Sequence, residues 1–118
     1  MTKPDAIPVE LLPPTYRTAV TTSVLPVPYG GASPYVVPKG FETDFASIPR
    51  IFWRVWPPWG PWTPAAIMHD RLYVTHSTTR KEADRRFREA MRLCDVNWFT
   101  RWAFWAGVRL AGWMHWKR

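Results

Sequence analysis

The chain has 118 residues, which is enough for one domain with a buried core but not for two. Hydrophobic residues make up 47% of the sequence, which excludes general disorder, and a single cysteine, Cys94, excludes a disulfide framework. Nine tryptophans and a net charge of +7 leave a small, basic and tryptophan-rich domain.

Charge and proline divide the sequence into two unlike halves. All 13 prolines lie between Pro4 and Pro64, which favours extended and turn-rich structure there. Residues 71–118 contain eleven basic and four acidic side chains and therefore account for the whole net charge. We expect no membrane-spanning helix, because no stretch of about 18 apolar residues is free of charge. The N-terminal residues have no hydrophobic run of signal-peptide length, so we expect no secretion signal.

The first predicted elements are extended. Residues 1–15 are predicted to form a proline-rich arm in a polyproline-like conformation, followed by a single domain over residues 16–118. Threonine and valine favour strands, and proline and glycine favour turns. The sequence accordingly predicts a strand over 16–25, a turn over 26–31, and short strands over 35–37 and 41–45.

The later elements are predicted helices, and each begins at a capping residue. Ser47 can cap a short helix that ends near residue 56, and Thr63 with Pro64 can begin a second that ends near residue 75. Thr79 opens a capping box for a third helix to about residue 94, and Asn97 can cap a fourth that ends near Gly112. The predicted fold class is therefore α+β, with a short N-terminal β hairpin followed by three to four helices.

The last predicted helix is apolar on almost every face, so it is either a core helix or a helix that faces a partner. Trp98, Trp102, Trp105 and Arg109 recur on it at intervals of three and four residues. This row is either a core seam or a docking surface for protein or lipid, because Trp and Arg are enriched at interfaces.

The residues with the clearest chemistry lie on two neighbouring predicted helices. His69 and Tyr73 are four residues apart and share one helix face, and Asp84 borders the apolar stripe of the next helix. A carboxylate beside a buried stripe needs a hydrogen-bond donor. Two antiparallel helices would bring the three side chains together, either as a structural hydrogen bond or as a catalytic group.

Three motifs in order resemble a family of bacteriophage and prophage proteins catalogued as a domain of unknown function. They are Gly-Phe-Glu-Thr-Asp-Phe-Ala-Ser-Ile-Pro-Arg at 40–50, His-Asp-Arg-Leu-Tyr at 69–73 and Ala-Asp-Arg-Arg-Phe at 83–87. The resemblance covers about residues 35–118. It implies a phage particle component, of the tail or baseplate, that is made in the host cytoplasm and binds other phage structural proteins during assembly or host entry.

The second and third motifs also resemble the phospholipase A(2) superfamily, which implies a phospholipase-like helical core. The resemblance implies that His69 is the base that deprotonates water, that Asp70 binds calcium, and that Asp84 and Tyr73 orient the histidine. It also implies host envelope lipid as a substrate. The family has a glycine-rich calcium loop before the histidine, whereas residues 57–63 here are Pro-Pro-Trp-Gly-Pro-Trp-Thr.

Other candidate residues lie outside these two helix faces. Asp44 can cap the short helix, pair with Arg50, or act as a ligand or catalytic carboxylate. Trp59, Trp62, Arg85 and Arg88 are candidates for binding a partner. The basic face of Lys81, Arg85, Arg88 and Arg92 also allows nucleic-acid binding, which we rank last because no recognised base-reading motif accompanies it.

Overall fold

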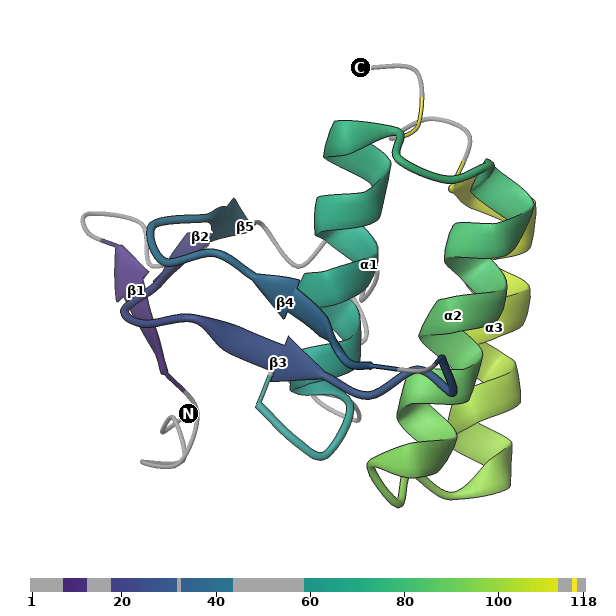
Figure 1. Ribbon diagram of the computed structural model, residues 1–118. Coiled ribbons are helices and arrows are strands. Elements are labelled where there is room, and N and C mark those ends of the chain that lie inside the picture. The colour runs from purple at the N-terminus through teal and green to yellow at the C-terminus, as the bar shows by residue number, and fades with distance from the viewer. Residues whose placement is uncertain (1–7, 13–17, 32, 44–58, 113–115, 117–118) are drawn as a thin grey trace.

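The computed structural model describes residues 8–12, 18–31, 33–43, 59–112 and 116. Small antiparallel sheets precede three helices, which confirms the predicted α+β class (Figure 1). The strands are β1 (Val9–Leu12), β2 (Thr18–Thr21), β3 (Leu25–Val27), β4 (Tyr35–Val37) and β5 (Glu42–Thr43). The helices are α1 (Thr63–Thr75), α2 (Arg80–Leu93) and α3 (Trp98–Ala111). The short helix predicted over 47–56 lies outside the described residues.

The first sheet has three strands in the order β1-β2-β5, all antiparallel. The prediction of a polyproline-like arm is wrong at residues 9–12, because these residues pair with β2 and place Val9 opposite Thr21. Val9 and Ala19 are fully buried, so the strand belongs to the core of the domain. The four-residue strand fits between Pro8 and Pro13, where the density of prolines concealed it.

The second sheet consists of β3 and β4, which replaces the single predicted hairpin with two small sheets. The predicted turn begins later than expected, because Leu25, Pro26 and Val27 are in strand conformation. Pro26 is tolerated because a two-stranded sheet consists of edge strands alone. Val27 and Val37 are both fully buried and contribute to the core.

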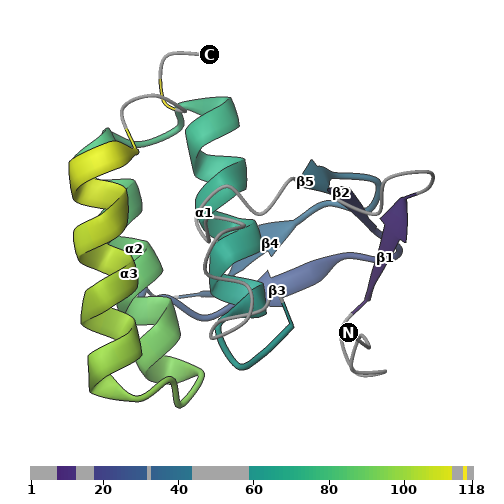
Figure 2. The same ribbon diagram turned by 180° about the vertical axis from the view of Figure 1, so that it is seen from behind.

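Helix α1 is the central element of the molecule. It packs against β3, β4 and β5 on one side and against α2 on the other, and α3 packs against α2 (Figures 1 and 2). The end of α1, the start of α2 and the end of α3 therefore lie together at one end of the helical layer. None of the helices in the described ranges is long and apolar enough to cross a membrane.

Side-chain caps fix where α2 and α3 begin, as the sequence predicts. The Thr79 hydroxyl accepts a hydrogen bond from the Glu82 backbone N–H at 3.1 Å. The Asn97 side-chain oxygen accepts one from the Thr100 N–H at 2.9 Å. These bonds satisfy backbone donors that have no partner within the helix, and so they set the rotation and start of each helix.

Candidate functional site

A polar cluster around one carboxylate lies inside the helical layer. Asp84 is fully buried in the second turn of α2. Its Oδ1 lies 2.7 Å from His69 Nε2 and accepts a hydrogen bond from the Tyr73 hydroxyl at 2.5 Å. The predicted juxtaposition of these three side chains is therefore present, because α1 presents His69 and Tyr73 on the face that packs against α2.

The second carboxylate oxygen is bound by two arginines, neither of which the sequence predicted to lie near Asp84. Arg109 Nη1 donates to Asp84 Oδ2 at 2.8 Å, and Arg80 Nη1 lies 3.8 Å from the same oxygen. Arg80 also donates to the carbonyls of Val108 and Arg109 at 3.0 and 3.2 Å, which joins the start of α2 to the end of α3. We call His69, Tyr73, Arg80, Asp84 and Arg109 the Asp84 cluster.

The charge state of the cluster follows from its hydrogen bonds. Burial alone would raise the pKa of Asp84, but the hydrogen bonds from His69, Tyr73 and Arg109 outweigh it and lower the pKa below its usual value. Burial and the hydrogen bond to Asp84 raise the pKa of Tyr73, so its hydroxyl remains a donor. An ionised carboxylate can only accept, and His69 therefore donates through its Nε2–H.

Aromatic rings enclose His69. Its ring centroid lies 4.2 Å from that of Tyr73 and 4.6 Å from that of Phe87, and the residue is 2% exposed. Trp116 packs edge-on against Tyr73 at 5.2 Å. A Cβ added at Gly112 would lie 2.6 Å from the Tyr73 hydroxyl, so a glycine is needed where the end of α3 closes on the cluster. Such enclosure suits a structural role as well as a catalytic one.

The calcium site that the phospholipase resemblance implies lies only partly within the described residues, because residues 57–58 of the segment before the histidine lie outside them. Asp70 lies next to His69 on α1 and is partly exposed. No three His, Cys, Asp or Glu side chains gather to bind a metal in the described part of the chain. The Gly60 carbonyl, in the segment that would replace the calcium loop, accepts a hydrogen bond from the Thr63 N–H at 3.0 Å. Asp44 and Arg50 lie outside the described residues.

Of the two tryptophans predicted to bind a partner in the segment before α1, Trp59 is buried in the core and Trp62 is partly buried against it. Trp59 is 6% exposed, and Trp62 packs edge-on against Phe104 with 5.7 Å between ring centroids. Both indole rings therefore contribute apolar contacts to the core. The proline- and tryptophan-rich composition of this segment did not distinguish an inward from an outward turn.

Charged side chains along the outer side of α2 pair within the helix. Arg85 binds the Glu82 carboxylate through two nitrogens, at 2.8 and 2.7 Å, and Arg92 pairs with Glu89. Arg88 lies over the rings of Trp102 and Trp105, at 4.7 and 5.2 Å from their centroids. Three of the arginines predicted as a binding face, Arg85, Arg88 and Arg92, therefore each contact a neighbouring side chain.

The tryptophan row of α3 is not a core seam. Trp98 is 68% exposed and Trp102 is 44% exposed, whereas Phe104 and Val108 form the buried face of the helix. Phe99 and Leu110 are exposed as well. We call these four exposed side chains, Trp98, Phe99, Trp102 and Leu110, the aromatic ridge. Its exposure favours the docking alternative over the core seam.

Comparison with known proteins identifies a family to which this chain is similar. The family model described as "Protein of unknown function (DUF1353)" matches residues 22–108, which include His69, Tyr73 and Asp84 and end one residue before Arg109. No curated protein and no solved structure matches the chain. The predicted resemblance to a family of unknown function is confirmed, while the phage origin and the phospholipase resemblance stay predictions.

Proposed function

We propose that this chain, which belongs to the DUF1353 family, is an ester hydrolase whose general base is His69. The observation that supports the proposal is the 2.7 Å contact between His69 Nε2 and the buried, ionised carboxylate of Asp84. A carboxylate on one ring nitrogen fixes the histidine tautomer, and Nδ1 is then the basic nitrogen of the ring, the atom through which a general base accepts a proton. The Tyr73 hydroxyl and Arg109 hold the carboxylate in place.

The proposed reaction is hydrolysis through an activated water. His69 Nδ1 takes a proton from water while the water oxygen attacks the ester carbonyl carbon. The bond from that carbon to the alcohol oxygen then breaks, and the imidazolium returns its proton to the leaving oxygen. Asp84 stabilises the imidazolium between the two steps, because it is an anion within hydrogen-bond distance of Nε2.

Phospholipid of a host envelope is the proposed substrate, on the strength of the motif resemblance. We assign no step to calcium, because no three His, Cys, Asp or Glu side chains gather among the described residues and the segment that would supply carbonyl ligands is described only in part. Because His69 is buried, the proposed hydrolysis also requires a change of conformation. A ring that is 2% exposed meets little water, so the residues that cover it must separate when substrate binds.

The test is fatty-acid release from mixed phospholipid vesicles, measured with and without calcium. We expect His69→Gln to lower the rate about 100-fold or more, as removal of a general base does. His76→Gln is the matched control, because it removes an exposed histidine outside the Asp84 cluster. Absence of release from the folded wild-type chain in both conditions, or equal rates in wild type and His69→Gln, would overturn the proposal.

The aromatic ridge supports a second proposal, that the chain is a component of a phage tail or baseplate. Trp98 and Leu110, near the two ends of α3, are 68% and 80% exposed, and large exposed apolar side chains are enriched at protein interfaces. A particle component must co-purify with washed particles at a fixed ratio. We expect Trp98→Ser to reduce that ratio and Val74→Ser, which alters an exposed apolar residue on α1, to leave it unchanged. Absence from washed particles would contradict this role.

A further inference from the structure

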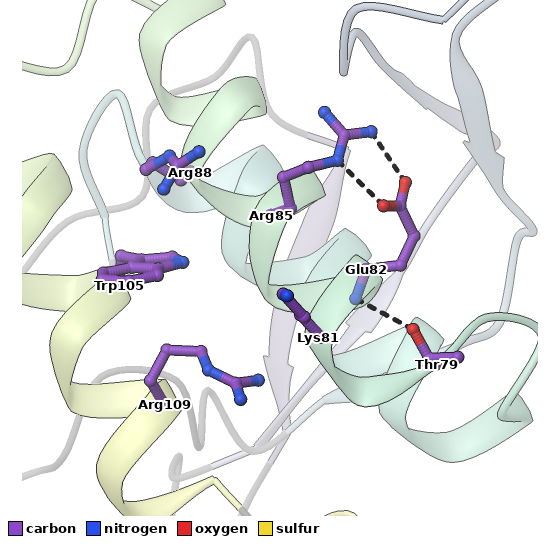
Figure 3. Close-up of a pocket in the computed structure, with 7 residues that line it drawn as sticks. All are labelled: Thr79, Lys81, Glu82, Arg85, Arg88, Trp105 and Arg109. Atoms are coloured by element: carbon purple, nitrogen blue, oxygen red, sulfur yellow. Dashed lines mark hydrogen bonds and ion pairs between the residues drawn. The ribbon is translucent and has the colours of Figure 1, made fainter.

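A hollow of about 270 Å³ opens between α2 and α3 (Figure 3). Its lining consists of Thr79, Lys81, Glu82, Arg85, Arg88, Trp105 and Arg109. Four of these side chains are cationic and one is anionic, so the lining has a net charge of +3. Helix α2 supplies Lys81 and Arg85, and α3 supplies Arg109 and the Trp105 ring, so both walls contribute to the site.

Glu82, the single carboxylate of the lining, and Asp84, which pairs with Arg109 from behind it, only partly balance the four cations. Glu82 is shared by Arg85 and by Arg86, which lies outside the hollow and donates to Oε2 at 3.0 Å. Like charges held close together repel one another, and an anion between them relieves that repulsion. The concave shape strengthens the effect, because low-dielectric walls focus the field of the charges.

The arginines of the hollow are already positioned for a ligand. Arg88 rests on the Trp102 and Trp105 rings, and Arg109 is held by Asp84 through Nη1. A guanidinium has five N–H donors, so one bond to Asp84 leaves Arg109 further donors. Little side-chain entropy remains to be lost when such groups bind.

We propose that this hollow binds a phosphate group, in a phosphate monoester or diester. Guanidinium forks match the oxygens of phosphate in geometry, and a phosphate monoester has nearly two negative charges to set against the +3 lining. Trp105 adds a flat apolar wall for the organic part of the ligand. The site is separate from the proposed hydrolysis and does not depend on it.

Arg109 connects this hollow to the Asp84 cluster, because the same guanidinium lines one and hydrogen-bonds the other. The phosphate has two possible sources, a small soluble ester or a lipid headgroup. Both present the same oxygens to the arginines. The experiment therefore uses one probe of each kind.

The soluble probe is glycerol 3-phosphate, titrated into the full chain in a calorimeter. The membrane probe is sedimentation with vesicles of phosphatidylcholine alone and of phosphatidylcholine mixed with phosphatidylglycerol. Arg85→Gln is the test variant and Arg92→Gln its matched control. Both arginines are about half exposed on α2 and pair with a glutamate three residues earlier, but only Arg85 lines the hollow.

We expect Arg85→Gln to weaken binding about tenfold, the effect of losing one charge-assisted hydrogen bond, and Arg92→Gln to leave it nearly unchanged. Binding of glycerol 3-phosphate with this pattern identifies a soluble phosphate ester as the ligand. The same pattern with vesicles only identifies a lipid headgroup. Absence of binding to either probe by the folded chain, or equal weakening by the two variants, would overturn the proposal.

Discussion

Helix α2 presents two kinds of carboxylate, and their surroundings differ completely. Asp84 is fully buried and binds side chains from α1 and α3. Glu82 and Glu89 lie on the outer side of the same helix and pair with arginines of α2 itself. The comparison teaches that burial, and not the number of ion pairs, decides which carboxylate holds the fold together.

The physical reason is the cost of removing a charge from water. A buried anion keeps its charge only if donors replace the lost water, and loss of the anion leaves those donors without a partner. An exposed pair exchanges its partners for water at little cost. The two classes on α2 are therefore expected to respond very differently to substitution.

The largest loss of stability is expected from replacing the buried carboxylate, Asp84. Asp84→Ala leaves His69, Tyr73 and two arginines facing a cavity, and we expect the free energy of unfolding to fall by about 3–5 kcal/mol. Urea denaturation followed by circular dichroism measures this. Glu42→Ala, at an exposed glutamate on β5, serves as the control. A loss below about 1 kcal/mol would remove the distinction between the two classes.

Acid removes part of the free energy of unfolding that the Asp84 carboxylate contributes. The folded state lowers the pKa of Asp84, so its contribution is complete above the unfolded value of 3.8 and disappears as pH falls toward the lower folded value. Hydrogen bonding from Arg85 lowers the pKa of Glu82 to about 2, but this carboxylate is partly exposed and contributes less. We expect the melting temperature to decline below about pH 4, with a smaller decline in Asp84→Asn. Parallel curves for wild type and Asp84→Asn between pH 2 and 6 would contradict this origin.

The smallest loss of stability is expected from replacing the partly exposed carboxylates, Glu82 and Glu89. Glu82→Gln removes two partly exposed ion pairs, each worth about 0.3–0.5 kcal/mol, so the total loss is expected to stay below about 1 kcal/mol. Glu89→Gln, which removes the pair with Arg92, should cost less still. Both losses should vanish in 1 M salt, where exposed pairs are screened. Urea denaturation at low and high salt measures them, and a loss equal to that of Asp84→Ala would refute the comparison.

Local sequence rules predicted the parts of the site that lie within one helix or between adjacent helices. Thr79 and Asn97 bond to backbone N–H groups three residues later, so capping chemistry located the helix starts. His69 and Tyr73 share a face because the helix repeats every 3.6 residues. The short connection between α1 and α2 then brought Asp84 opposite them.

Features that depend on three-dimensional packing were not predictable in the same way. Arg109 is 25 residues from Asp84, and only the register of α3 against α2 brings them together. Arg80 offered a signal, because it precedes Asp84 by four residues on one helix. The burial of individual tryptophans was not predictable either. Trp59 is buried and Trp98 is exposed, although both stand in aromatic, charge-poor segments.

Asp84 of α2 is bound by donors from α1 and from α3, and this arrangement affects how the protein folds. A partly assembled state that docks α2 against α1 alone would bury the carboxylate without Arg109, and one that docks α2 against α3 alone would bury it without His69 and Tyr73. Either intermediate contains a poorly compensated charge and is raised in free energy. The three helices are therefore bound into one cooperative unit, in which docking and undocking are all-or-none.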